Sequence, residues 1–179
     1  RCNLCSNRCL ITVNTFSGGK KFISGNRCER GAGAQKKKDT LPNLFVFKYS
    51  RLFDYYVPLP KDKAKRGEIG IPRVLNLYEN NPFWFTFFTQ LGYHVVLSAP
   101  SSRDIFNAGL ETIPSQTVCF PAKMVHGHIA KLIERGVKSN FYPAIPHVVE
   151  EFADADNNFN CPVLATYPAL IRLTVDYMA

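Results

Sequence analysis

Four cysteines crowd the first 28 residues, and their spacing limits what this segment can fold into. Thiols clustered in so short a segment share a metal ion or pair as disulfides. The first two are three positions apart, so both sulfurs can reach one ion from a single tight turn. The spacing therefore predicts a metal site whose ligands are Cys2, Cys5, Cys9 and Cys28. Two disulfides, or four unpaired thiols at the chain end, are the alternatives.

The residues between the third and fourth cysteines predict a β-hairpin that brings the thiols together. Residues 10–16 and 20–24 both read as strands, and Ser17-Gly18-Gly19 is a favourable turn between them because glycine accepts positive φ. The hairpin would return Cys28 to the first pair of cysteines. Zinc is the favoured ion, as in small structural zinc modules, and iron is the alternative because tetrahedral thiolate sites suit both metals.

Length and composition predict a folded protein with one main domain. The chain has 179 residues, of which 46% are hydrophobic and 13% aromatic. No apolar run is long enough to span a bilayer and no secretory signal is present, so we expect no membrane association. Cysteines without a disulfide framework then predict a reducing, cytoplasmic location. Because the chain begins at Arg1, we interpret it as a piece of a longer polypeptide.

The net charge of +8 is concentrated in the N-terminal part of the chain. Residues 1–66 hold 15 Lys/Arg against 4 Asp/Glu, whereas residues 67–179 hold 7 against 10. The densest basic runs, at residues 36–38 and 61–66, lack interleaved aromatic residues. Nucleic-acid binding is therefore a minor alternative, and we expect a solvated linker or a surface for an acidic partner.

Three segments are expected along the chain: a Cys-rich ribbon-like module at residues 1–38, a helix with a basic linker at 39–66, and an α/β domain at 67–179. The helix is predicted between Asn43, a plausible N-cap, and Pro58. Its apolar residues recur at helical spacing and predict one face packed on the domain that follows. These residues are Phe45, Tyr49, Leu52, Phe53 and Tyr56.

From residue 68 onward, predicted strands and helices alternate. The predicted strands are residues 69–72, 93–97, 139–142 and 163–166, and the predicted helices are residues 82–91, 101–106, 120–135, 147–152 and 167–177. Such alternation predicts a doubly wound α/β domain, with a parallel sheet and helices on both faces. Ligands in such domains bind beyond the carboxyl ends of the strands, so four loops are candidates for the site.

The first candidate loop, residues 72–82, follows the first predicted strand. Arg73 and several amide side chains give it one cation and many hydrogen-bonding groups, which favours an anion or carbonyl site. No G-x-G-x-x-G or Walker pattern accompanies it, so no nucleotide signature is present. An ordinary polar loop that caps a helix is the alternative.

The second candidate loop carries Cys119 directly before a predicted helix, where the helix dipole favours a thiolate. Lys123 adds positive charge one turn further on. His126 and His128 lie on different helical faces, so they do not form an H-x-x-x-H metal site. For Cys119, a nucleophile, a cluster ligand and an inert packed thiol remain open, and the residues alone favour the inert thiol.

The last two candidate loops are less informative. Residues 143–147 follow a predicted strand, and residues 154–162 deliver Cys161 just before the last one. Asp154 and Asp156 can bind a hard cation, but they lack the spacing of an EF-hand, so a solvated loop is the favoured interpretation.

Three long segments resemble a module of large bacterial activase-related proteins, which are relatives of the (R)-2-hydroxyacyl-CoA (2-hydroxyglutaryl-CoA) dehydratase system. They are IGIPRVLNLYENNPFWFTFF at residues 69–88, IPSQTVCFPAKMVHGH at 113–128 and DNNFNCP at 156–162. The Cys-rich segment, with FSGGKKFISGNRCERG at residues 16–31, resembles the stretch that joins the ATP-binding activase domains to that module. The resemblance thus covers nearly the whole chain.

This resemblance implies a role in electron transfer to acyl-CoA chemistry. In that system an activase couples ATP hydrolysis to transfer of one low-potential electron. The electron is accepted by a dehydratase of flavodoxin-like α/β domains, whose cysteines hold a [4Fe–4S] cluster near the acyl-CoA. The chain then corresponds to the dehydratase-like acceptor. Its implied partners are the activase domains of the same longer chain and an acyl-CoA.

Residue by residue, the resemblance implies a cluster site that this chain only partly supplies. Cys119 matches the first cluster cysteine, whereas Ala144 stands where the second is expected. Cys161 is then a substitute ligand or unrelated, and a third ligand would lie beyond Ala179. Arg73, Lys123 and His126 are expected near the substrate. The alternative function is a non-catalytic scaffold or interaction domain with a structural zinc ribbon.

Overall fold

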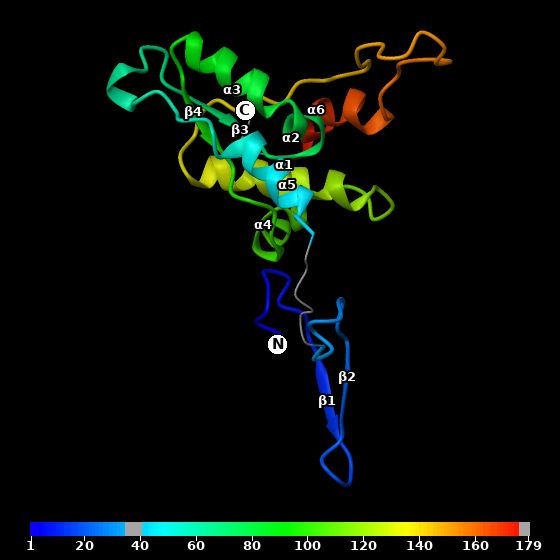
Figure 1. The fold of residues 1–179 in the computed structure, drawn as a ribbon. Coiled ribbons are helices and arrows are strands. Elements are labelled where there is room, and N and C mark those ends of the chain that lie inside the picture. The colour runs from blue at the N-terminus through cyan, green and yellow to red at the C-terminus, as the bar shows by residue number, and fades with distance from the viewer. Residues whose placement is uncertain (35–40, 176–179) are drawn as a thin grey trace. The chain divides into compact units, whose positions relative to one another are not determined.

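A computed structural model describes residues 1–34 and 41–175 of the chain (Figure 1). Its backbone contacts divide the chain into two compact units, Arg1–Leu44 and Phe45–Ala179, and each is described by itself. The basic run predicted at residues 36–38 lies outside the described residues. In the described part of the chain, no helix is both long enough and apolar enough to cross a bilayer.

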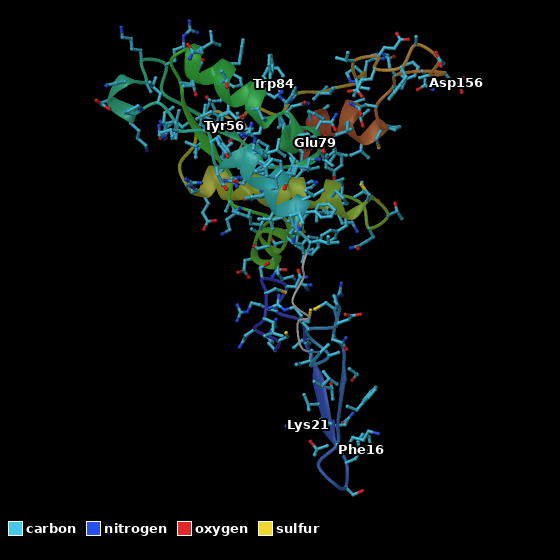
Figure 2. All side chains as sticks on the ribbon, viewed as in Figure 1. Phe16, Lys21, Tyr56, Glu79, Trp84 and Asp156 are labelled. Carbon is cyan, nitrogen blue, oxygen red and sulfur yellow. The ribbon has the colours of Figure 1, made fainter. Side chains whose placement is uncertain are left out.

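The N-terminal unit is built around an antiparallel hairpin. Strand β1 (Thr12–Thr15) pairs with β2 (Lys21–Ser24), and Val13 lies opposite Ile23. The turn glycines, Gly18 and Gly19, have φ values of 84° and 77°, which side chains with a Cβ rarely adopt. Strands and turn therefore lie where the sequence predicts them. Figure 2 labels Phe16 and Lys21 near the turn of this hairpin.

Helix α1 (Leu44–Phe53) lies within the predicted helical stretch, but only its last turns pack as expected. Phe53 is buried and its ring lies 4.9 Å from that of Tyr78 and 5.0 Å from that of Tyr49. Phe45, one turn before Tyr49, is 86% exposed. Only the C-terminal end of the predicted apolar face is therefore packed, where α1 meets the rest of the second unit.

The second unit contains a small parallel sheet. Strand β3 (Glu68–Ile71) pairs in parallel with β4 (His94–Leu97). On the other side of β3, Gly70 forms a single parallel bridge with Asn140, where the sequence predicts a full strand. The Gly70 N–H donates to Ser139 O and the Phe141 N–H donates to Gly70 O, both at 2.8 Å. The unit is therefore a mixed α/β fold, and the larger flavodoxin-like sheet stays a prediction.

Helices cover both faces of this sheet. Helix α2 (Leu75–Glu79) leads into α3 (Asn81–Gln90), and α3 packs Phe85 and Phe88 on Ile69, Ile71 and Val95. On the opposite face, α5 (Phe120–Glu134) packs Leu132 on Val96 and Val137. Figure 1 shows α3 and α5 on the two sides of β3 and β4. The layered arrangement expected for a doubly wound domain is thus present around the two strands.

The remaining helices complete the unit. Helix α4 (Arg103–Ala108) is capped by the Ser102 side chain, which accepts from the Ile105 N–H at 3.2 Å. Single 3-10 turns lie at Lys61–Lys63 and Leu110–Thr112. Helix α6 (Pro162–Thr174) packs Tyr167 and Ile171 against Val125 and Ile129 of α5.

Two sequence predictions in the C-terminal part are wrong. Residues 163–166, read as a strand because of their apolar run, are the first turns of α6. Pro162 opens this helix, and apolar residues at helical spacing give it a face to pack on α5. Residues 147–152, read as helical, form no helix. His147 bridges to Phe159 in antiparallel fashion, and the Val148 N–H donates to Asn158 O at 3.0 Å.

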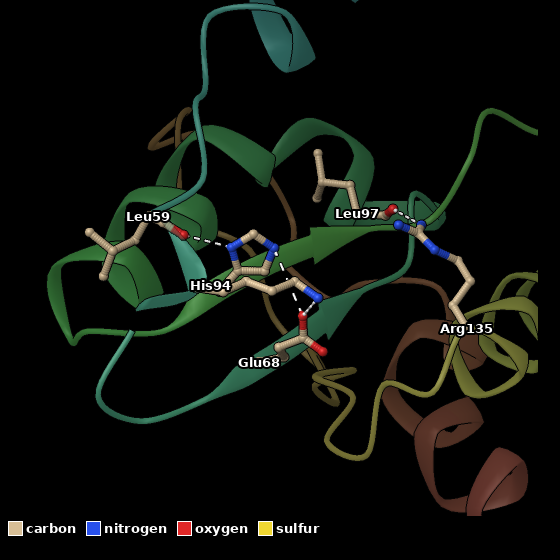
Figure 3. A network of polar contacts seen from close by, with 6 residues as sticks. Leu59, Glu68, His94, Leu97 and Arg135 are labelled. Atoms are coloured by element: carbon tan, nitrogen blue, oxygen red, sulfur yellow. Dashed lines mark hydrogen bonds and ion pairs between the residues drawn. The ribbon is translucent and has the colours of Figure 1, made fainter. Parts of the chain in front are cut away.

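A polar network holds the amino ends of the two strands (Figure 3). Glu68 opens β3 and pairs with Lys61 at 2.6 Å, while His94 opposite it in β4 donates Nδ1–H to Leu59 O at 2.6 Å. The hydrogen bond from Lys61 is the main cause of the lowered pKa of the Glu68 carboxyl. At the other end of β4, Arg135 donates to Leu97 O at 3.0 Å. The amino ends of the strands are thus occupied by their own ion pairs.

Helices α4 and α5 approach so closely that two glycines are required at the contact. A Cβ on Gly127 would lie 1.8 Å from Ile105 O, and a Cβ on Gly109 would lie 2.2 Å from the Gly127 N. Neither distance is physically possible without movement of the backbone. Gly127 therefore allows α4 to pack directly on the backbone of α5.

We predict that Gly127→Ala destabilises the protein by about 1–3 kcal/mol, because overpacking outweighs the ~1 kcal/mol gained in helix propensity. Urea unfolding followed by circular dichroism measures this change. Lys131→Ala on the same helix is the control, since it removes only a surface ion pair with Glu134 and is expected to change stability by less than about 1 kcal/mol. Equal stability of Gly127→Ala and the parent protein would contradict the close approach.

Candidate functional site

An open cleft of about 910 Å³ lies beyond the carboxyl ends of the parallel strands. Residues 73–76 and 78–80 follow β3, Ser101 follows β4, and Ile145 follows the bridge at Asn140; all of them line the cleft. The lining also includes Phe83 and Trp84 of α3, Pro121 and Met124 of α5, and residues of the segment 147–160. Figure 2 labels two lining residues, Glu79 and Trp84, near the ends of α2 and α3. The four loops predicted to form the site all contribute to this cleft.

Arg73 brings positive charge to the cleft. Its guanidinium donates from Nη1 to Tyr49 Oη at 2.6 Å and lies 4.6 Å above the Phe53 ring. Its Nε is buried and has no hydrogen-bond partner among the described residues. In the same part of the chain, no carboxylate lies within ion-pair distance of Arg73. A cation that is neither fully solvated nor paired favours an anion nearby.

The turn that places Arg73 is itself strained. Two residues on, Leu75 has a φ of 47°, in the left-handed region that a leucine rarely adopts. The Arg73 backbone N–H donates to Ser98 Oγ at 2.8 Å, so the turn after β3 is tied to the end of β4. Such strain persists only where the surroundings hold it, and it is common at ligand-binding sites.

Behind the cleft, His128 of α5 is fully buried between two serines. Its Nδ1 lies 2.7 Å from Ser98 Oγ, and its Nε2 lies 3.0 Å from Ser101 Oγ. Ser98 is 1% exposed, whereas Ser101 is exposed and lines the cleft. A chain of hydrogen bonds therefore runs from the backbone of Arg73 through the imidazole to the cleft surface.

His126, two residues earlier, points to a different neighbour. The Thr112 hydroxyl donates its one proton to Gly109 O at 2.9 Å, so its oxygen can only accept from His126. The His126 Nδ1–H therefore donates to Thr112 Oγ1 at 2.9 Å. His126 Nε2 then accepts from the Tyr167 hydroxyl of α6 at 3.0 Å. This second relay joins α5 to α6 inside the core and does not line the cleft. The two histidines thus lie on different faces of the helix, as predicted.

Burial makes both histidines neutral at physiological pH. Removal from water lowers the pKa of His126 from 6.5 to about 4, and it lowers the pKa of His128 to about 4 as well, with a smaller contribution from the Arg73 charge. Burial raises the pKa of Tyr167, and negative charge on the neighbouring Cys119 adds to the rise. Both relays therefore consist of uncharged groups.

Cys119 and Cys161 occupy equivalent positions at the start of α5 and α6. Each is the exposed N-cap residue of its helix and is followed by a proline within the first two helical positions. Pro121 and Asn160, close neighbours of these cysteines in sequence, line the cleft. Cys119 and Cys161 themselves are not among the described residues that line it.

Lys123 forms a hydrogen bond to the loop before α5. Its Nζ donates to Gln116 O at 2.7 Å, and it is not among the residues that line the cleft. Of the predicted substrate residues, then, Arg73 lies at the cleft, Lys123 holds the loop before α5, and His126 lies in the core. Their catalytic roles stay predictions.

The four N-terminal cysteines lie in the other unit. The Cys2 N–H donates to Cys9 O at 2.8 Å, Cys2 is 8% exposed, and the Gly31 N–H donates to Cys28 Sγ at 3.4 Å. Within residues 1–34 and 41–175, no three His, Cys, Asp or Glu side chains are grouped closely enough to hold a metal ion. The structure therefore does not show the metal site predicted at Cys2, Cys5, Cys9 and Cys28.

Sequence reasoning missed the serines of the His128 relay. Ser98 and Ser101 directly follow β4, so the rule that ligands bind beyond strand ends could have indicated them. What the sequence could not show is that a histidine 30 residues further on lies between them.

These features define a class: a mixed α/β domain with a ligand-sized cleft at the carboxyl ends of a small parallel sheet. Residues 68–179 match the family model of the CoA enzyme activase uncharacterised domain (DUF2229), and the chain belongs to this family. The match confirms the predicted relationship to activase-related proteins. Neither the comparison with curated proteins nor the comparison with solved structures yields a match.

We predict that the protein loses stability as the pH falls from 7 to 5. An unfolded histidine binds a proton near pH 6.5, whereas the folded His126 and His128 do so only near pH 4. Acid therefore favours the unfolded state, by up to roughly 2 kcal/mol per histidine at pH 5. Urea unfolding at half-unit pH intervals measures the slope.

Exposed His147 supplies the control for this pH dependence. His147→Gln is measured beside the parent protein, because His147 is exposed and takes no part in either buried relay. A stability that stays flat between pH 7 and pH 5 would contradict the buried neutral histidines.

Proposed function

We propose that the second unit is the dehydratase-like, electron-accepting domain of an activase-related protein and binds an acyl-CoA thioester in its cleft. In this proposal, Cys119 and Cys161 are ligands of an iron–sulfur cluster at the cleft rim. The activase domains of the same longer chain are the electron donor. Membership in the CoA enzyme activase uncharacterised domain family supports the relationship to CoA chemistry.

The observation that carries the proposal is the matching position of two exposed thiols at the starts of two helices. Cys119 and Cys161 are the N-cap residues of α5 and α6, and Pro121 and Asn160, close to them in sequence, line one cleft. The cleft volume of about 910 Å³ lies within the range of small-molecule sites. Arg73 in the cleft supports binding of a substrate that carries negative charge, as an acyl-CoA does.

The described residues of this unit fit such a cluster only in part. They include two cysteines, whereas an iron–sulfur cluster usually needs four protein ligands. No third histidine, cysteine or carboxylate is grouped with them in the described ranges. The proposal therefore requires ligands from outside these residues. No chemical step through the cluster is derived from this chain.

The first test is the iron, zinc and acid-labile sulfide content after anaerobic purification. We expect iron and sulfide together, lost in Cys119→Ser and in Cys161→Ser because each change removes a ligand. The matched control is Cys2→Ser, which changes a cysteine in the other unit and is expected to leave this iron in place. Iron that disappears only in Cys2→Ser would place the cluster in the N-terminal unit and contradict the proposal.

A structural zinc ribbon is the second candidate, for the N-terminal unit. The N–H···S hydrogen bond from Gly31 to Cys28 is of the kind that supports metal-bound thiolates, and the hairpin lies between the cysteines as such a ribbon requires. In this case the protein would be a scaffold or interaction module without redox chemistry of its own.

For this alternative we expect one zinc per chain and no iron, with zinc lost in Cys2→Ser and in Cys28→Ser. Cys119→Ser then changes neither the metal content nor, beyond about 1 kcal/mol, the stability, because Cys119 is exposed. Metal analysis and urea unfolding of the three variants measure both effects. Zinc retained in both N-terminal variants would exclude the ribbon.

A further inference from the structure

The hydrogen bonds around His128 determine which of its nitrogens carries the proton. Ser98 Oγ accepts from the Arg73 N–H at 2.8 Å, and the Ser98 hydroxyl is within reach of one acceptor in the described structure, His128 Nδ1 at 2.7 Å. Because Ser98 is 1% exposed, water cannot replace that acceptor. A buried hydroxyl proton without an acceptor is costly, so Ser98 donates to Nδ1.

The rest of the relay follows from this assignment. Since Nδ1 accepts, the neutral imidazole carries its proton on Nε2 and donates to Ser101 Oγ at 3.0 Å. The Ser101 hydroxyl proton is then left free of the histidine. Ser101 is exposed and lines the cleft, so its hydroxyl proton is available to a ligand there. Each hydrogen bond in the series strengthens the next one as a donor.

His126 shows that this arrangement is specific to His128. There the neighbouring hydroxyl of Thr112 has a carbonyl acceptor in Gly109, so the proton lies on Nδ1 instead. One helix thus carries two buried histidines in opposite tautomers. The hydrogen bonds of His126 end at Tyr167 in the core, whereas those of His128 end at Ser101 on the cleft.

We propose that Ser101 and Arg73 form an oxyanion-binding subsite in the cleft, with the Ser101 hydroxyl as hydrogen-bond donor and the Arg73 guanidinium as the compensating charge. A carboxylate is acceptor-only and a phosphate carries several strong acceptor oxygens, so either matches a hydroxyl donor and an unpaired cation that line the same cleft. Of the carboxylates that line the cleft, Glu79 is paired with Lys48 and Glu151 is exposed to solvent. Neither lies within ion-pair distance of Arg73.

This subsite extends the proposed function. It rests on that function only for the identity of the molecule that supplies the oxyanion. A phosphate would come from the nucleotide part of CoA, and a carboxylate would come from the acyl group. The Ser98–His128–Ser101 relay requires neither a metal nor Cys119. An experiment that contradicts the subsite can therefore be distinguished from one that contradicts the cluster proposal.

Calorimetric titration with inorganic phosphate, succinate and coenzyme A tests the subsite. We expect binding of at least one probe to the parent protein, weakened about tenfold or more in Ser101→Ala because a hydrogen bond to a charged group is lost. Ser115→Ala is the matched control, since this exposed serine bonds only within its own loop and is expected to bind as the parent does. Iron and zinc contents of both variants should equal those of the parent.

The probes separate the two sources of the oxyanion. Binding of phosphate and coenzyme A without succinate identifies a phosphate subsite, and binding of succinate alone identifies a carboxylate subsite. Either result, with the loss in Ser101→Ala, supports the proposal. No binding of any probe, or equal affinity in Ser101→Ala and Ser115→Ala, would overturn it, even if the cluster is present.

Nitrogen-15 NMR of the histidine side chains provides a test that does not depend on a ligand. We expect His128 in the neutral form with its proton on Nε2, and His126 in the neutral form with its proton on Nδ1. A proton on Nδ1 of His128 would reverse the relay and remove the Ser101 donor, which contradicts the proposal. Two-bond proton–nitrogen correlation spectra distinguish these forms.

Discussion

The hydrogen bonds of two buried histidines on one helix hold the second unit together. His128 joins α5 to the segment after β4, and through Ser98 to the backbone after β3. His126 joins the same helix to Thr112 on one side and to Tyr167 of α6 on the other. A buried polar group without a partner is costly, so each histidine requires these segments in these positions. Through Ser98 and Ser101, His128 thus connects the two segments after β3 and β4 that line the cleft.

Close packing and hydrogen bonding act together along this helix. Gly127, the residue between the two histidines, lets α4 lie against the helix backbone. Without that approach, the 3-10 turn at Leu110–Thr112 that follows α4 would not bring Thr112 to His126. The sequence His126-Gly127-His128 therefore combines one steric requirement with two polar ones.

Charge is distributed unevenly around the strands. Their amino ends are closed by the ion pair between Glu68 and Lys61 and by the hydrogen bond of His94. At the carboxyl ends, the relay is neutral and Arg73 has no carboxylate partner within the described residues. The Arg73 charge would therefore favour an anionic group at its own position in the cleft, as the proposed acyl-CoA site requires.

The sequence by itself determined the local elements with strong periodicity or capping, namely the hairpin, β3, β4, α3 and α5, and the family of residues 68–179. It also indicated the strand ends as the candidate site, where the cleft lies, because that rule depends only on the order of strands and helices. It was wrong for the first turns of α6, because the apolar run at residues 163–166 resembles a short strand and its packing on α5 is not visible in the sequence. Only the tertiary structure decided which side chains meet. Ser98, Ser101 and His128 are separated by up to 30 residues, and their contact arises from the packing of α5 on the sheet rather than from any local pattern.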